Sequence, residues 1–406
     1  MSQLPADVLF TVLGFAYARP EPSAARKYTF KTRRAWFAST FLVASAWYAA
    51  GQPILYRRIA VSFQEDWQFD SLLRTLTSSN GAAEETLAQK IHELFIGNHR
   101  HEVIPEYEKA FPVPGIPIIT QKGRRGWRRK RKYDKLRRLL GICFSLKRLE
   151  VYAIHISKLA PALEELWVRH RRLEHLEVYD MNSKFHTLWS DLAQFTFWSH
   201  LPALTIHASP NHRTYGNPSW KLVDLPLPLK GGRLMSLEIF AHVHAGVLQD
   251  ILLSASLTLR TLICNETIQI FSDQINAVTF GPVAKTLTSL TLTLESIDKL
   301  GNISSMTALI CLTLVLKSCE RQLPRGRPLS MCVFPPNLQT IEWRAKAGVD
   351  PWILAERVRD TLHAFDGDRL VGLRSIIVTA TLQSSKEVSL WTILAALLQG
   401  ITKTRT

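Results

Sequence analysis

Closely spaced histidines are the residues of this chain whose type and spacing suggest chemistry. His99 and His101 lie two positions apart with Glu102 beside them, and His242 and His244 repeat that spacing. On a strand, alternate side chains share a face, so each pair could contact one metal ion. A zinc site needs further ligands, and the sequence completes neither set. We therefore predict surface histidines, no metal site and no cofactor.

Recognisable catalytic motifs are missing from the sequence. There is no Gly-x-Ser-x-Gly, no P-loop and no Gly-x-Gly-x-x-Gly after a strand pattern, and Lys230-Gly231-Gly232 is too short to hold a phosphate. The five cysteines are odd in number and include no Cys-x-x-Cys, so they predict neither a disulfide framework nor a zinc site. We expect a chain that binds other molecules and is not an enzyme, in a reducing compartment.

The positive charge is concentrated in one segment. Residues 122–138 hold eleven Lys or Arg and one Asp, and so supply +10 of the net charge of +16. Such a run can be a nuclear import signal, a binding site for nucleic-acid phosphates or a solvated loop. We predict an insert at about residues 107–138 that loops out between repeats and carries an import signal. The residues of that signal are Lys122, Arg124, Arg125, Arg128, Arg129, Lys130, Arg131 and Lys132.

Apolar residues at positions i, i+3 and i+5 recur ten times along the chain. After a first interval of 55 residues, successive triplets start 22 to 35 residues apart, which is the period of a leucine-rich repeat with one strand and one return per unit. The first interval is about two periods long and contains the basic insert. The triplets begin at Ile91, Leu146, Leu173, Leu201, Leu234, Leu259, Leu287, Leu309, Leu338 and Leu373.

These triplets predict an α/β fold for residues 64–406. The units resemble degenerate leucine-rich repeats, which implies a solenoid with parallel strands on the concave side and helices or irregular returns outside. Capping residues and apolar spacing predict helices over 66–79, 245–256, 350–367 and 384–400, the last of them covering the open edge of the final repeat.

The N-terminal residues 1–63 carry a different pattern. Leu4-Pro5 with apolar residues at helical spacing, a Leu-Val-x-x-x-Trp and a Pro-Ile-Leu-Tyr-Arg exit resemble an F-box of the fungal type. The resemblance implies helices that dock a Skp-type adaptor, which joins the chain to a cullin complex. The residues implied as adaptor contacts are Leu4, Pro5, Val8, Leu9, Leu13, Leu42, Val43 and Trp47.

The repeat register predicts a substrate face. Residues between and beside the last two apolar positions of a triplet point away from the core. Glu150 and Glu177 then become neighbouring like charges, which is unfavourable unless solvent or a cation meets them. We expect this face to receive a basic segment of a partner, or the chain's own insert, with a merely solvated face as the alternative. Its residues are Glu150, Tyr152, Glu177, Tyr179, His207, Glu238 and Phe240.

Two functions fit these patterns. The first is a non-catalytic substrate-recognition subunit of an SCF-type (cullin–RING) ubiquitin ligase, in which the repeats bind a protein target. The second is a nuclear repeat scaffold that binds nucleic acid or chromatin through the insert. The apolar run at 8–18 matches a signal peptide poorly, because Asp7 and no Lys or Arg precedes it. The run at 35–56 is interrupted by polar residues and by Pro53, which favours a buried helix over a transmembrane helix. We therefore expect no membrane partner and a nuclear or cytoplasmic protein.

Overall fold

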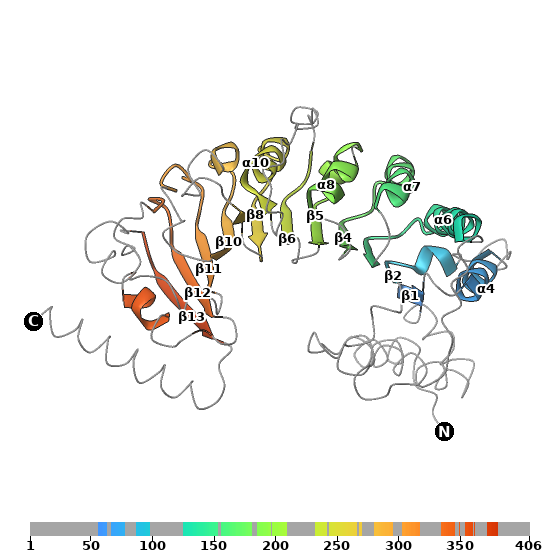
Figure 1. Cartoon of the computed structure of the whole chain (residues 1–406), viewed down its shortest axis with the longest axis horizontal. Coiled ribbons are helices and arrows are strands. Elements are labelled where there is room, and N and C mark those ends of the chain that lie inside the picture. Colours follow the sequence, from blue (N-terminus) through green and yellow to red (C-terminus); the bar gives the residue numbers. More distant parts are fainter. Residues whose placement is uncertain are drawn as a thin grey trace, which may run out of the picture. The chain divides into compact units, whose positions relative to one another are not determined.

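A computed structural model shows parallel β-strands joined by helical or irregular returns (Figure 1). The chain divides into two compact units, of which the first ends at Asp180 and the second begins at Met181. The structure describes residues 56–62, 66–77, 87–97, 125–152, 156–180, 185–195, 197–208, 232–241, 243–265, 268–269, 280–294, 303–316, 334–345, 349, 354–359, 361 and 372–380. It describes only the backbone of residues 60, 62, 66–68, 125–132, 169–170, 185–187, 244–246, 268–269, 294 and 380.

The described residues of the first unit form four strands, each parallel to the next. In chain order and in sheet order they are β1 (Arg58–Ser62), β2 (Glu93–Gly97), β3 (Arg148–Tyr152) and β4 (His175–Asp180). Because parallel neighbours need a crossover connection, each pair of strands is separated by a return segment.

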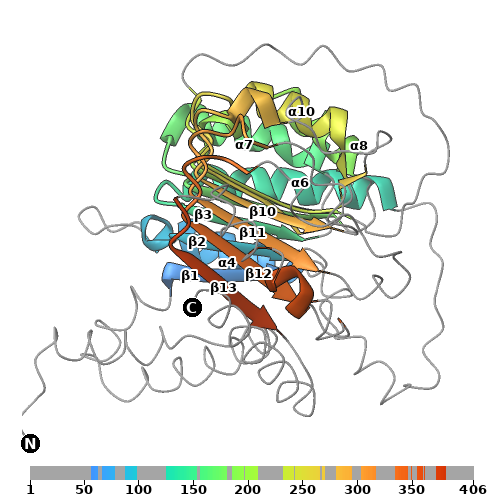
Figure 2. The ribbon, with the colours of Figure 1, turned by 90° about the vertical axis from the view of Figure 1, so that its left-hand side faces the viewer.

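Those returns are largely helical. They contain α4 (Asp66–Thr77), the 3₁₀ helix η1 (Leu87–Lys90), α6 (Arg125–Ile142) and α7 (Ile156–His170). α6 packs against both α4 and α7, and Figure 2 shows α6 and α7 on the same side of the strands. The predicted helix over 66–79 is confirmed as α4, with its apolar stripe buried at Phe69, Leu73 and Leu76.

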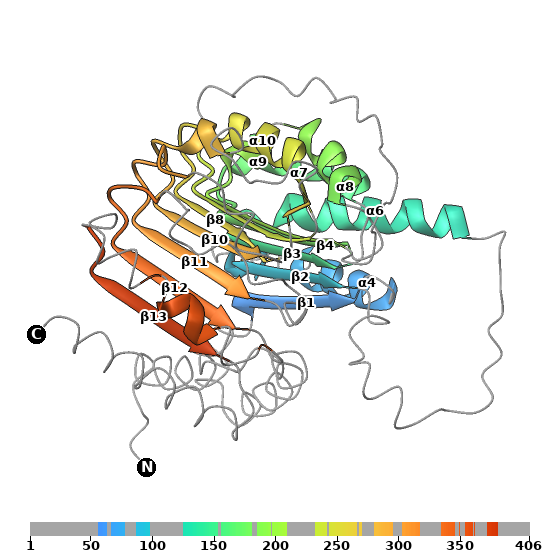
Figure 3. The ribbon, with the colours of Figure 1, turned by 60° about the vertical axis from the view of Figure 1, so that its left-hand side comes forward.

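In the part of the second unit that the structure describes, seven parallel strands follow one another in chain order (Figure 3). A short additional pair, β7 (Val243–His244) and β9 (Ile268–Gln269), forms a separate two-stranded sheet. The seven strands are β5 (Ala203–Ala208), β6 (Ser236–Phe240), β8 (Thr261–Cys264), β10 (Ser289–Leu294), β11 (Cys311–Leu316), β12 (Thr340–Ala345) and β13 (Ser375–Ala380).

Helices of the second unit lie on one side of these strands (Figure 1). They are α8 (Phe185–Ala193), α9 (Phe197–His200), α10 (Ala245–Ser254) and the 3₁₀ helix η3 (Gly281–Val283). α10 confirms the helix predicted over 245–256. Residues 354–359 are helical as predicted, whereas the predicted helix over 384–400 lies outside the described residues.

All ten apolar triplets fall at strands of the structure, so the predicted α/β class with parallel strands is confirmed. The first residue of each triplet precedes its strand and the other two lie inside it. Nine triplets are buried, and the residues of the tenth, Leu373, Ile376 and Val378, are half-buried. The strands also start alike: the carbonyl of Lys147 accepts from the amides of Glu174 and His175 at 2.7 and 2.9 Å, and this pattern recurs in later repeats.

The structure differs from the prediction at three places in the first unit. β2 pairs directly with β3, so the first interval is one repeat with a long return and not two periods. β1 belongs to the sheet although it falls inside residues 1–63. The insert does not loop out along its whole length, because residues from Arg125 onward form α6. Leu136, Leu139 and Leu140 supply a buried stripe at helical spacing that holds α6 on the unit.

Candidate binding face

Polar and aromatic side chains of β3 and β4 lie on the face of the strands opposite to α6 and α7. Leu149 and Val151 are fully buried towards the helices, so the alternating residues of β3 point the other way. The parallel register places Glu150 beside Glu177 and Tyr152 beside Tyr179. The predicted adjacency of these two pairs is therefore confirmed.

Arg148 neutralises the two neighbouring carboxylates. Its Nη2 lies 2.8 Å from Oε1 of Glu150 and 3.0 Å from Oε2 of Glu177. The side chains of the glutamates are only 9% and 10% exposed, whereas that of Arg148 is 35% exposed. A residue of the same strand thus already supplies a cation to the two carboxylates. That this face receives a basic segment of a partner stays a prediction.

The two tyrosines of this face bind each other and the glutamates. The rings of Tyr152 and Tyr179 stack with centroids 4.0 Å apart and an interplanar angle of 10°. The hydroxyl of Tyr152 donates to Oε2 of Glu150 at 3.2 Å, and that of Tyr179 donates to Oε1 of Glu177. One face of each ring is thus covered by the other tyrosine. Arg148, Glu150, Tyr152, Glu177 and Tyr179 form one preorganised group, which we call the Arg–Glu–Tyr cluster.

Burial and crowding of charge alter the acidity of this cluster. Burial, and then the neighbouring charge of Glu177, raises the pKa of Glu150 to about 7 from its ordinary value of 4.5, although Arg148 and the Tyr152 hydroxyl oppose the rise. Burial likewise raises the pKa of both tyrosine hydroxyls, so they remain hydrogen-bond donors at neutral pH. The cluster therefore takes up a proton near neutral pH.

Glu150→Gln should reveal this proton through stability. The raised pKa means that the folded chain holds more protons than the unfolded chain between pH 4.5 and 7, so the contribution of Glu150 is most favourable below pH 4.5 and is lost as the pH rises through 7. Between pH 5 and 8, the free energy of unfolding of the wild type should fall by about 1–3 kcal/mol relative to that of Glu150→Gln. Hydrogen exchange of the β3 and β4 amides measures this difference. Glu342→Gln is the control. Because the pKa of Glu342 is lowered, its contribution to stability changes with pH only below pH 5. A wild-type-to-variant difference that is constant with pH would contradict the prediction.

In the second unit, β5 and β6 present a similar pairing. Thr205 lies beside Glu238, and His207 lies beside Phe240. The imidazole of His207 stacks on the ring of Phe240 with centroids 4.1 Å apart and an interplanar angle of 12°. As predicted from the register, these side chains alternate with the buried Leu204 and Ile206.

A second charged group lies on β11 to β13 of the same unit, and the sequence analysis missed it. Arg344 donates to both carboxylate oxygens of Glu342, at 2.7 and 2.9 Å, and the hydroxyls of Thr313 and Thr379 donate to the same carboxylate at 3.1 and 3.2 Å. The hydrogen bonds from Arg344 lower the pKa of Glu342. Arg344 stands two residues from Glu342, as Arg148 does from Glu150. This spacing of an arginine and a glutamate on one strand could have predicted the ion pair from the sequence.

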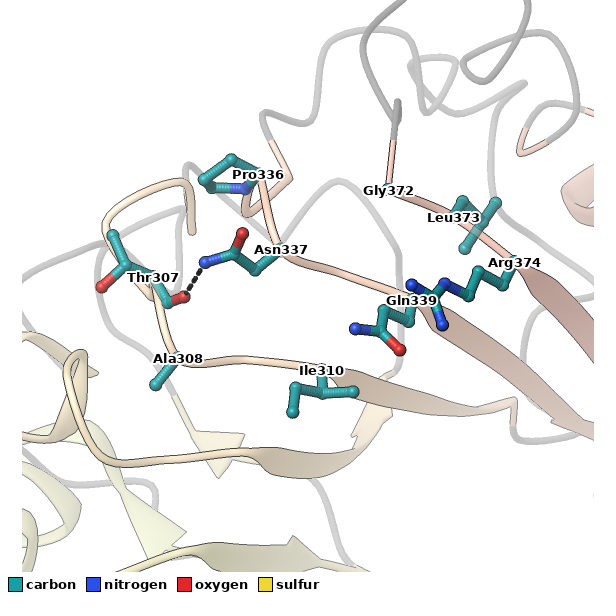
Figure 4. A pocket seen from close by; sticks show the side chains of 9 residues that line it. All are labelled: Thr307, Ala308, Ile310, Pro336, Asn337, Gln339, Gly372, Leu373 and Arg374. Atoms are coloured by element: carbon teal, nitrogen blue, oxygen red, sulfur yellow. Dashed lines mark hydrogen bonds between the residues drawn. The ribbon is translucent and has the colours of Figure 1, made fainter.

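A hollow of about 510 Å³ lies where β11, β12 and β13 begin (Figure 4). Its wall includes Asn337, whose amide donates to the carbonyl of Thr307 at 2.7 Å and ties two consecutive repeats together. Gly372 allows the segment before β13 to approach the segment before β12, because a Cβ at this position would lie 3.1 Å from the carbonyl oxygen of Pro336. No sequence motif pointed to this hollow, since it is built from equivalent loop positions of three repeats.

The remaining predicted site residues fall elsewhere. Of the import residues, Arg125 and residues 128–132 lie in α6, and Lys122 and Arg124 lie outside the described residues. His244 lies in β7, whereas His242 and the pair at 99 and 101 fall outside the described part. Within the described ranges, no group of three His, Cys, Asp or Glu side chains is placed to hold a metal ion. The predicted adaptor contacts all lie outside the described residues: Leu4, Pro5, Val8, Leu9, Leu13, Leu42, Val43 and Trp47.

α6 also locates the basic insert relative to the face. Lys135 pairs with Asp70 of α4 at 2.7 Å, and Arg137 pairs with Glu165 of α7 at 2.6 Å. The described part of the insert therefore lies among the helices, and the hypothesis that this part covers the Arg–Glu–Tyr cluster is wrong. None of the helices in the part of the chain that the structure describes has the length and apolarity needed to cross a membrane.

Comparisons with known proteins add no family to these observations. No family model matches the chain, and no curated protein matches it with significant similarity. The fold class thus rests on the strand register and burial, and the F-box and leucine-rich-repeat resemblances rest on the residues quoted for them.

Proposed function

We propose that the chain is a non-catalytic substrate-recognition subunit of an SCF-type ubiquitin ligase. Its N-terminal F-box docks a Skp-type adaptor and thereby the cullin complex, and its leucine-rich-repeat-like solenoid binds a target protein. The chain performs no covalent step in this proposal. It raises the effective concentration of the target beside the ligase, so that ubiquitin transfer becomes nearly intramolecular.

The F-box-like residues carry the adaptor part of this proposal, and the Arg–Glu–Tyr cluster carries the target-binding part. Tyrosine and arginine are the residues that most often dominate protein–protein binding energy. Here Tyr152 and Tyr179 are half-buried, stacked and anchored through their hydroxyls, so little side-chain entropy remains to be lost when a partner binds. A stiff, mixed polar and aromatic face favours recognition of a protein surface.

The proposal is tested by capture of a purified Skp-type adaptor on the immobilised full-length chain. We expect a complex that survives an increase in salt, because F-box docking buries mainly apolar side chains. Binding that is absent at low salt as well as at high salt would overturn the adaptor assignment. The adaptor is used alone, so the result does not depend on which target the repeats bind.

The basic helix favours a second candidate function, a nuclear repeat scaffold that binds nucleic acid. α6 carries most of the insert's positive charge over its 18 residues, and a helix concentrates that charge more than a loop does. Phosphate binding weakens steeply with salt, in contrast to apolar docking. Retention of duplex DNA that declines in this way, without adaptor capture, would favour the scaffold.

The import signal is tested within the same helix. Changing Arg128, Arg129, Lys130 and Arg131 to Ala removes four charges at positions of α6, and alanine is a strong helix former, so the helix should persist. We expect a fluorescently tagged variant to move from the nucleus to the cytoplasm. Replacing the same four residues by other Lys or Arg residues should preserve nuclear entry, and a nuclear alanine variant would assign the charge another role.

A further inference from the structure

The hollow at the start of β11, β12 and β13 is formed by equivalent residues of three repeats. Cys311, Thr340 and Ser375 are in register, so the residues before them, Ile310, Gln339 and Arg374, form one row. Figure 4 shows the side chain of Arg374 extending from its strand towards Gln339, with Ile310 on the next strand along. Neighbouring strands lie about 5 Å apart, so the row of three residues spans about 10 Å, which is the length of about three residues of an extended peptide.

The polar groups of this row are available to a ligand. In the part of the chain that the structure describes, the guanidinium of Arg374 and the side-chain amide of Gln339 make no hydrogen bond or ion pair. Among the described residues, nine line the hollow and none of them is Asp or Glu. An arginine that no described carboxylate pairs with favours an anion, since arginine binds carboxylates and phosphates through paired N–H donors.

The rest of the wall is apolar. Ile310 is 41% exposed although it is a large aliphatic residue, and the half-buried Leu373 and the exposed Pro336 also line the hollow. A nucleic-acid backbone would meet one cation and an aliphatic surface here, which is a poor match for a row of phosphates. A peptide that carries one anionic side chain beside apolar ones matches both parts of the wall.

We propose that this hollow binds an anionic side chain of an extended segment of the target protein, with Arg374 contacting the anion and Gln339 contacting the peptide backbone. This inference extends the proposed function and depends on it at one point, namely that the peptide belongs to the target protein. A carboxylate and a phosphorylated side chain offer the same charge chemistry, and the experiment distinguishes them. Because the experiment needs no adaptor, its failure is separate from failure of the F-box assignment.

The probe is an array of short peptides whose central residue is glutamate, phosphoserine or glutamine and whose flanking positions are random mixtures. We expect the full-length chain to retain the anionic sets over the glutamine set. Arg374→Gln should weaken retention of the anionic sets by about tenfold, which is the usual size of a charge-assisted contact. Tighter binding of phosphoserine than of glutamate would identify the anion as a phosphate, and the reverse would identify a carboxylate.

Charge changes at Ile310 provide an internal check. Its exposure lets Ile310→Glu and Ile310→Lys fold, and they should weaken and strengthen retention of the anionic sets, respectively. Met235 stands at the equivalent position before β6, is 51% exposed and does not line the hollow, so Met235→Glu and Met235→Lys are matched controls with no expected effect. Equal retention of all three peptide sets, or equal effects at Met235 and Ile310, would overturn the proposal. Retention of single-stranded DNA that Ile310→Glu abolishes would overturn it in favour of a nucleic-acid ligand.

Discussion

Replacing Arg148 by Met should destabilise β3 and β4 by about 2–4 kcal/mol. The substitution keeps the aliphatic stem but leaves the carboxylates of Glu150 and Glu177 adjacent, nearly buried and without their shared cation. We place the loss below that of a fully buried pair because Arg148 is 35% exposed. Hydrogen exchange of the β3 and β4 amides measures the loss where it arises, and lowering the pH to 5 should restore part of it as Glu150 takes up a proton.

Arg344→Met is the matched control for this prediction. Arg344 also stands two residues from its glutamate on a strand, but it is 51% exposed and faces a single carboxylate that two threonine hydroxyls already bind. An exposed pair of this kind contributes about 0–1 kcal/mol. Equal losses for the two substitutions would show that burial of the carboxylates has no part in the role of Arg148.

The same geometry changes how the substrate face should be probed. Reversing Glu150, Glu177 and Glu238 to Lys is the test that the sequence suggests for a basic partner. In the structure, two of these lysines would surround Arg148 and remove its hydrogen-bond acceptors, so the sheet itself would be perturbed. A loss of target binding would then have two causes. Charge changes at exposed positions such as Ile310 avoid this ambiguity.

Much of the fold could be predicted from the sequence because the core of each repeat is local. The triplet spacing places Leu149 and Val151 on the buried side of β3 and Glu150 on the other, and the same alternation holds in later strands. Adjacent triplets in the sequence become adjacent strands, so the pairing of Glu150 with Glu177 followed from the order of repeats alone.

The returns and the state of the charged residues could not be predicted in the same way. The high charge density of the basic segment suggested a loop, although the spacing of Leu136, Leu139 and Leu140 indicated a helix. The sequence showed Glu150 and Glu177 as neighbours but not that Arg148 reaches both, since that contact depends on side-chain geometry across two strands. The hollow needs three returns of unequal length to meet, which no local pattern encodes.

Changing Leu9 and Leu13 together to Asp should abolish capture of the Skp-type adaptor. Both leucines belong to the F-box-like pattern and fall outside the described residues. Carboxylates in an apolar docking surface lose their hydration without gaining partners, so the expected effect is loss of detectable binding. As a control, Leu9→Ile with Leu13→Met keeps the apolar character and should retain the adaptor within about tenfold.

Adaptor capture by the full-length chain, compared between the wild type and the Leu9→Asp, Leu13→Asp variant, tests the central claim most directly. Hydrogen exchange of β2 to β13 on the same samples establishes that the repeats stay folded. The account predicts a stable complex for the wild type and none for the variant, with unchanged protection of the strands. Capture that is equal for both, or absent for both, would contradict the assignment of this chain as an adaptor-bound receptor.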